Sequence, residues 1–312
     1  MKYRLGTRKS ELALKQSESI QKLLEKKGCL TELVLIESEG DSQTTKPLYE
    51  IESEGPGLFT KRLEKALLEN KIDLAVHSLK DLPTLQPVEL KVAAIPKRES
   101  AQDCLILLES QFDASQFLGL RERAVVGTSS LRRQAQLKAV RPDLEVVSLR
   151  GNVPTRLNAV RSGKVEAVVL AEAGLNRLGI SLEGLRKQTL PLERFVPAPG
   201  QGALAIEVRK DCPKDLLEAI QLLNDPATEL ATQIERKVLR ELEGGCTLPL
   251  GVFCQKEGKE LKLQAFLGVE EGRSQGVPVW GDFHRFDILG AVEHTLVAQT
   301  VEYFRSRNHA RK

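Results

Sequence analysis

Short apolar runs alternate with helical patterns in the first third of the chain. Tyr3–Thr7 and Leu33–Ile36 read as strands, and the stretch from about Ser10 to Lys27 between them predicts a helix. A second helical pattern follows Gly57, and Leu74–Val76 is the next short strand. A continuous apolar run such as Leu33–Ile36 is typical of a strand buried on both faces. This alternation predicts βαβ units and a mostly parallel sheet.

The middle third repeats this alternation. Strands are predicted at Ala124–Val126, Glu145–Ser148 and Ala167–Leu170, each leading into a helix. Pro197–Gly202 then has the composition of a connection, and Ala203–Val208 is strand-like again. We therefore expect two α/β domains, with the chain crossing near residues 96–101 and returning near 197–202.

The pattern changes after Asp225-Pro226. A helix is predicted to about Leu242, followed by strands at Gly251–Phe253 and Leu261–Leu267 and a last helix around Ile288–Phe304. These elements predict a small α+β third domain. The predicted boundaries are residues 1–98 with 201–221 for the first domain, 99–200 for the second and 222–312 for the third.

Length and composition describe an ordinary globular protein with several domains. The 312 residues exceed the usual size of one core, and 46 basic against 43 acidic residues leave a net charge of only +3. An anion site must therefore come from local clustering. Five scattered cysteines without a CxxC pair and four scattered histidines argue against a metal site or disulfide framework. Because no long apolar run is present, we expect a cytoplasmic protein without a signal peptide or membrane span.

Basic side chains follow the predicted strands, where open α/β sheets bind ligands. The set comprises Arg8, Lys80, Arg132, Arg133, Arg150, Arg156 and Arg177, with hydroxyls at Thr128–Ser130. Arginine forks and free N–H groups at helix starts suit carboxylate or phosphate oxygens. Any one arginine could instead be a solvated surface charge. Nucleic acid is a weaker alternative, because only 4% of residues are aromatic.

Two further residues are candidates for chemistry. Asp81 is an acid among these bases: it could cap a helix or pair with an arginine, or it could stabilise a cationic intermediate. Cys246 follows Gly244-Gly245; it could be an idle buried thiol or a covalent attachment point. Residues 200–205 fit the dinucleotide pattern GxGxxA, but they open a strand rather than a helix, which argues against a nicotinamide site.

Six segments, in order along the chain, resemble motifs of the porphobilinogen deaminase (hydroxymethylbilane synthase) family. They are His77–Pro83, Gly127–Gln134, Leu149–Leu157, Leu170–Leu178, Pro199–Ala203 and Glu243–Cys246. The resemblance runs from about Arg4 to Cys246. It implies two α/β domains like those of type II periplasmic binding proteins, and a small α+β C-terminal domain. It also implies a transferase of haem and porphyrin biosynthesis that condenses four porphobilinogen units, with release of ammonia, to hydroxymethylbilane.

The same resemblance implies roles for individual residues. A dipyrromethane cofactor would be covalently linked to Cys246, and Asp81 would be catalytic, stabilising an azafulvene cation. The cofactor and growing chain would be bound by Lys80, Thr128, Ser130, Arg132, Arg133, Arg150 and Arg156. The incoming substrate would be bound by Arg8, Ser10, Arg177 and Gln201. We expect a monomer that binds neither nucleic acid nor membrane.

One segment departs from the family pattern. Ser53-Glu54-Gly55-Pro56 stands where many relatives have Gly-Gly-Lys, in a segment resembling a flexible lid. Lys46 or Lys61 could take over the missing lysine's role. The rival hypotheses are a non-catalytic solute-binding protein for a polycarboxylate, which predicts an export signal, and a nucleic-acid-binding protein, which predicts steep salt dependence of binding.

Overall fold

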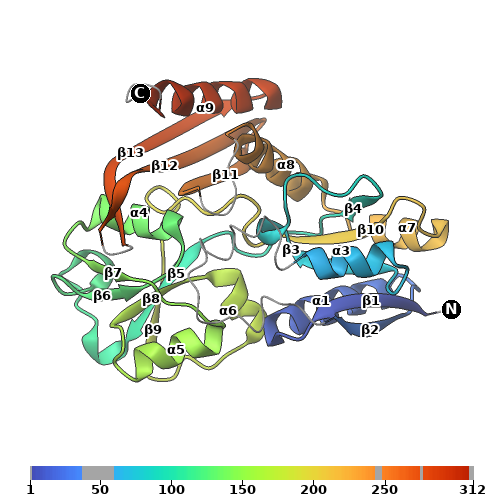
Figure 1. The fold of residues 1–312 in the computed structure, drawn as a ribbon, viewed down its shortest axis with the longest axis horizontal. Coiled ribbons are helices and arrows are strands. Elements are labelled where there is room, and N and C mark those ends of the chain that lie inside the picture. The colour runs from blue at the N-terminus through green and yellow to red at the C-terminus, as the bar shows by residue number, and fades with distance from the viewer. Residues whose placement is uncertain (1, 37–59, 243–247, 275–276, 309–312) are drawn as a thin grey trace.

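Three sheets organise the described chain (Figure 1). The computed structural model describes residues 2–36, 60–242, 248–274 and 277–308. The segment resembling a lid, with Lys46 and Ser53–Pro56, and the predicted attachment residue Cys246 lie outside these ranges.

The first sheet has five strands. Their order is β2 (Thr31–Ile36), β1 (Tyr3–Arg8), β3 (Leu74–Ser78), β10 (Leu204–Arg209) and β4 (Leu90–Ala94). β2, β1 and β3 are parallel, whereas β10 runs antiparallel to both its neighbours. Apolar side chains of α1 (Glu11–Glu25) and α7 (Lys214–Gln221) pack into the same core on this sheet, and those of α3 (Lys61–Leu68) join a second one.

The second sheet repeats this arrangement. Its order is β7 (Glu145–Val147), β6 (Val125–Gly127), β8 (Ala167–Ala171), β5 (Asp103–Leu108) and β9 (Leu185–Thr189). β7, β6 and β8 are parallel, and β5 runs antiparallel to β8 and β9. α4 (Leu131–Val140) packs into one core, and α5 (Val153–Arg161) and α6 (Glu172–Leu178) pack into another. The first four residues of β8 are buried, as expected of a strand covered on both faces.

The chain passes between these two sheets twice. β4 of the first sheet leads through residues 95–102 to β5, which is the antiparallel strand of the second sheet. β9 leads back through residues 190–203 to β10, the antiparallel strand of the first sheet. The two crossing segments therefore run between the C-terminal ends of the parallel strands, where the predicted site residues lie.

The third sheet is antiparallel and has its own core. β11 (Leu250–Glu257), β12 (Glu260–Ser274) and β13 (Val277–Gly290) form a meander. Apolar side chains of α8 (Pro226–Glu241) and α9 (Glu293–Asn308) pack into one core with this sheet. A second apolar cluster joins Phe253 and Phe266 of the sheet to Ala135 of α4. At this contact a Cβ at Gly268 would lie 2.6 Å from Ala135 Cβ, so the close approach of β12 to α4 requires glycine.

The predicted fold class is confirmed in its α/β character: two five-stranded mixed sheets, each with helices, are followed by a small antiparallel sheet with two helices. The domain boundaries stay a prediction. Two local expectations are wrong. Ile288 belongs to strand β13, which continues to Gly290, and the last helix begins only at Glu293. The sheets also contain strands that were not predicted, namely β4, β5, β9 and β13.

Candidate active site

Asp81 and Lys80 lie on a tight turn directly after β3. Leu79–Asp81 forms one turn of 3₁₀ helix, and we call Leu79–Pro83 the Asp81 turn. Leu79 is buried, and its N–H donates to the carbonyl of Ala203 (3.0 Å), which ties the turn to the start of β10. Apolar Leu79 and Leu82 anchor the turn in a small core, so the polar residues between them stand at the end of the strand.

Asp81 is half-buried and has no hydrogen-bond partner among the residues that the structure describes. Its sequence neighbour Lys80 has a strongly shifted pKa. Burial lowers the pKa of Lys80 to about 8, and the charges of Arg133 and Arg132 act in the same direction, whereas Asp81 and Asp103 oppose the shift. A carboxylate beside an ammonium group that readily loses its proton is a pair suited to proton transfer.

Arg132 and Arg133, at the start of α4, share one buried carboxylate, that of Asp103. Arg132 Nη1 lies 2.7 Å from Asp103 Oδ2, and Arg133 Nη2 lies 2.7 Å from Oδ1. Burial acts to raise the pKa of Asp103, but the charges and hydrogen bonds of the two arginines outweigh it and hold the pKa well below its usual range. Asp103 is not among the site residues predicted from the sequence. The only signal was a carboxylate opening the apolar run of β5, Asp-Cys-Leu-Ile-Leu-Leu.

Gln201 connects the two α/β domains at this point. Its side chain is fully buried, and Nε2 donates to the carbonyl of Ala101 (2.7 Å) and to Asp103 Oδ1 (2.9 Å). Its Oε1 accepts from Lys80 Nζ (3.5 Å) and Arg132 Nη2 (3.4 Å). Gln201, predicted to bind substrate, therefore joins the Asp81 turn to the arginine pair.

Arg150 and Arg156 follow β7 and extend the positive charge. Arg156 Nε donates to the carbonyl of Gly151 (2.9 Å). Burial lowers the pKa of Arg156 to about 10, and the nearby charges of Arg133 and Arg150 add to the shift. These three guanidinium groups, the arginine cluster, thus lie close enough to repel one another. Such a cluster is costly unless an anion offsets the repulsion.

Two guanidinium atoms in this region have unmet donor capacity. Within the described residues, Arg132 Nε and Arg150 Nη1 are buried and have no hydrogen-bond partner. A buried donor without an acceptor costs about 1–3 kcal/mol, more when charged. The arrangement therefore suits a ligand that supplies several anionic oxygens.

The predicted hydroxyl residues lie at the start of α4. Thr128 is fully buried, and its Oγ1 accepts from the N–H of Ser130 (3.3 Å). Ser130 is the N-cap residue of α4, and its side chain makes no capping hydrogen bond. The hydroxyl of Ser130 is therefore available beside the N-terminal N–H groups of the helix.

The predicted substrate residues Arg8, Ser10 and Arg177 lie at other strand and helix ends. Arg8 is half-buried at the end of β1, and Ser10 caps α1, accepting from the N–H of Ala13 (3.4 Å). Arg177 on α6 donates to the carbonyl of Gly202 (2.7 Å), next to Gln201. The structure thus places Arg177 beside the returning chain segment, whereas Ser10 already serves a helix end.

Four of the five cysteines lie within the described residues, and each is buried and free. Burial raises the pKa of both Cys104 and Cys254 to about 12, and it also raises the pKa of Cys29 and Cys212. A thiol in such surroundings is a poor nucleophile at neutral pH.

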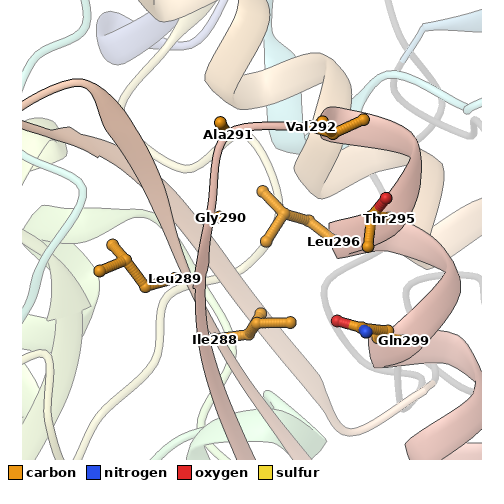
Figure 2. A pocket seen from close by; sticks show the side chains of 8 residues that line it. All are labelled: Ile288, Leu289, Gly290, Ala291, Val292, Thr295, Leu296 and Gln299. Atoms are coloured by element: carbon orange, nitrogen blue, oxygen red, sulfur yellow. The ribbon is translucent and has the colours of Figure 1, made fainter.

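A small apolar pocket lies elsewhere, between the end of β13 and α9 (Figure 2). It has a volume of about 120 Å³ and is lined by residues such as Ile288, Val292 and Leu296, with Gln299 at one side. No titratable side chain lines it. Among the described residues there is no cluster of metal-ligating side chains, and no helix is long and apolar enough to cross a membrane.

Comparison with known proteins identifies two matching family models. "Porphobilinogen deaminase, dipyromethane cofactor binding domain" matches residues 3–216, and "Porphobilinogen deaminase, C-terminal domain" matches residues 230–278. The chain is 45% identical over 269 residues to a porphobilinogen deaminase of Helicobacter hepaticus, covering 86% of this chain and 81% of the relative. It is 40% identical over 294 residues to a probable porphobilinogen deaminase of Methanosarcina barkeri, covering 92% and 90%.

Two solved structures match most of this chain at low identity. An ancestral arginine-binding protein bound to arginine matches with a TM-score of 0.38 and 16% identity, covering 71% of this chain and 90% of that one. An ABC transporter protein from Parabacteroides distasonis matches with a TM-score of 0.43 and 14% identity, covering 78% and 75%.

Proposed function

Because this chain belongs to the porphobilinogen deaminase family, we propose that the residues around the Asp81 turn and the arginine cluster form its active site. The chain is a transferase of tetrapyrrole biosynthesis: it condenses four porphobilinogen units head to tail, with release of ammonia, to hydroxymethylbilane. The assignment of individual residues to this reaction is our proposal.

The main support for this site is that two buried guanidinium donors, Arg132 Nε and Arg150 Nη1, have no hydrogen-bond acceptor among the described residues. Both belong to the region in which the arginine charges repel one another. The family's dipyrromethane cofactor carries acetate and propionate groups, and carboxylates are the acceptors that such donors need. The residues that would hold these groups are Lys80, Thr128, Ser130, Arg132, Arg133, Arg150 and Arg156. When bound, the cofactor supplies the pyrrole chain to which new units are added. Asp103 and Gln201 would keep the arginine pair in place by the hydrogen bonds described above.

Asp81 would act at the reacting nitrogen. When porphobilinogen loses ammonia, the C–N bond breaks and the aminomethyl carbon becomes cationic, with its charge shared by the ring nitrogen. A carboxylate that accepts a hydrogen bond from this N–H stabilises the cation and can take up its proton. The free acceptor capacity of Asp81, within the described part of the chain, supports this role.

Incoming porphobilinogen would be held by Arg8, Ser10, Arg177 and Gln201. Arg177 supports this best, because it lies at the returning segment, where it donates to the carbonyl of Gly202. The Gln201 side chain is already hydrogen-bonded within the protein, so its part would be to hold Lys80 in place. Cys246 would carry the cofactor. The buried state and raised pKa of the other four thiols favour Cys246 over them. We further propose a cytoplasmic monomer.

The purified protein tests the proposal directly. On addition of porphobilinogen it should release ammonia and form hydroxymethylbilane, and its intact mass should exceed the sequence mass by a dipyrromethane. Peptide mapping should put that mass at Cys246; Cys246→Ser should lack it, whereas Cys212→Ser should retain it. An active enzyme without added mass would refute the attachment. A protein that binds porphobilinogen without releasing ammonia would instead be the solute-binding alternative.

A further inference from the structure

Helix α8 of the third domain places two adjacent charged residues against the segments that build the site. Glu235 is fully buried; its two oxygens accept from Arg98 Nη1 (2.7 Å) and from the N–H of Gly200 (2.7 Å). Arg98 and Gly200 lie on the two crossing segments, one on each. Glu235 therefore ties both segments to α8.

The next residue, Arg236, contacts the Asp81 turn itself. Its Nη1 donates to the carbonyls of Leu79 (3.1 Å) and Leu82 (2.7 Å), and its Nη2 donates to the carbonyl of Pro83 (2.6 Å). These three carbonyls bracket Lys80 and Asp81 in the chain. One guanidinium fork thus fixes the main chain on both sides of the proposed catalytic carboxylate.

Arg236 holds the turn through its main chain and not through a carboxylate. The described residues give Arg236 only main-chain carbonyls as partners, and burial lowers its pKa to about 10. A buried arginine that satisfies carbonyls contributes to main-chain position rather than to neutralising a carboxylate. The other main-chain hydrogen bonds of the turn are from Leu79 N–H to Ala203 O and from Leu82 N–H to Leu79 O (3.2 Å), and neither holds Asp81 or Pro83.

We propose that Arg236 is a positioning residue for the transferase reaction, holding the Asp81 turn, and with it the Asp81 carboxylate and Lys80, in place from the third domain. The inference rests on the proposed role of Asp81. An error of about 1 Å in the position of a catalytic group can cost roughly a hundredfold in rate. Removing the fork should therefore reduce turnover without removing any group that touches the substrate.

The test compares Arg236→Lys and Arg236→Gln with Arg209→Lys. Arg209 is a matched control, because its Nη1 also donates to main-chain carbonyls, those of Leu67 (2.8 Å) and Ile72 (3.0 Å), at the far end of β10. For each protein we would measure Tm, intact mass, hydrogen exchange of the peptide containing the Asp81 turn, kcat, KM and the pH profile of kcat. The lysine variant keeps the positive charge and an ammonium group that can donate to one carbonyl. It therefore allows the test to be made even if the glutamine variant does not fold.

Both Arg236 variants should retain the cofactor mass and should exchange faster in the Asp81 turn. Their kcat should fall by about ten- to a hundredfold while KM changes less than about threefold. The basic limb of the pH profile should move to higher pH, because displacing the turn exposes Lys80 and relieves the burial that lowers its pKa. Arg209→Lys should lower Tm while leaving kcat and the pH profile unchanged.

The proposal is overturned if the Arg236 variants keep normal exchange in the turn, or if their kcat falls only as much as that of Arg209→Lys. A wild-type protein that does not convert porphobilinogen would refute the proposed function instead, and the exchange data would still decide whether Arg236 holds the turn.

Discussion

Arg133 and Asp103 form a buried ion pair, with Nη2 and Oδ1 2.7 Å apart and the Asp103 side chain fully inaccessible to solvent. Arg132 shares the same carboxylate, so a single acid holds two neighbouring cations in one orientation. The arginine pair of the proposed cofactor site is therefore positioned by Asp103, the first residue of β5.

Asp103→Asn should lower the free energy of unfolding by about 3–5 kcal/mol, because it leaves two buried guanidinium groups without their counter-charge. The folded pKa of Asp103 is depressed, so its stabilisation is present above the unfolded pKa of about 4 and is lost as the pH falls towards the folded pKa. The difference from wild type should thus be full at pH 7 and shrink below about pH 4, as measured by urea unfolding. Glu109→Gln, which removes an exposed partner of Arg186, should cost less than about 1 kcal/mol. Equal losses for the two variants would contradict the buried-pair account.

Asp81→Asn should leave a folded protein that retains the cofactor mass but turns over at least about a hundredfold more slowly. The amide keeps the shape and part of the hydrogen bonding but removes the charge that offsets a cation, which is worth several kcal/mol in a protected site. Steady-state rates and intact mass check this. Glu218→Gln, on an exposed pair with Lys214, is the control. Near-normal turnover in Asp81→Asn would make this residue structural.

Lys80 should lose its charge as the pH rises through about 8, well below an ordinary lysine near 10.4. Because its folded pKa is lowered, burying the charged form opposes folding below pH 8, and this cost disappears as the pH rises. In Cys246→Ser protein, which should lack the cofactor, NMR of ¹³C-labelled lysines should show one resonance titrating near pH 8. That resonance should vanish in Lys80→Arg and persist in Lys214→Arg, where an exposed lysine is replaced. Uniform titration near 10.4 would show that Lys80 is solvated.

Arg150→Lys should stall chain growth. A charge-assisted hydrogen bond is worth roughly 1.5–3 kcal/mol, and lysine lacks the planar fork that meets a carboxylate with two donors. After mixing with porphobilinogen, native mass spectrometry should resolve partly extended enzyme-bound species. Arg240→Lys, at an exposed position of α8 that pairs with Glu241 at 3.6 Å, should behave as wild type. If both variants elongate alike, Arg150 is a solvated charge and does not bind the growing chain.

The sequence by itself determined the parallel strands and the motifs that follow them. β3 begins with the apolar run Leu74–Val76, and β8 is apolar throughout. Polar residues after such strands, such as Lys80 and Asp81, must lie at the C-terminal edge of a parallel sheet. Local periodicity and strand direction are enough for this inference. The resemblance to the family motifs then implied a role for each residue at these positions.

Only the tertiary structure decided which charges meet. Gln201 lies 121 residues after Lys80, and Arg236 lies 157 residues after Leu79. Even Asp103, which is 30 residues from Arg133, has nothing in its local sequence that reveals its partner. The antiparallel strands β5 and β10 each begin where a crossing segment enters their sheet, so both segments lie between the two sheets. Helix α8 contacts these segments, for example through Glu235, which accepts from the N–H of Gly200. Ion pairs and carbonyl contacts depend on distances of a few ångströms between segments a hundred or more residues apart, as Arg98 and Gln201 illustrate. Such distances are properties of the packed molecule, so the support of the site could be found only there.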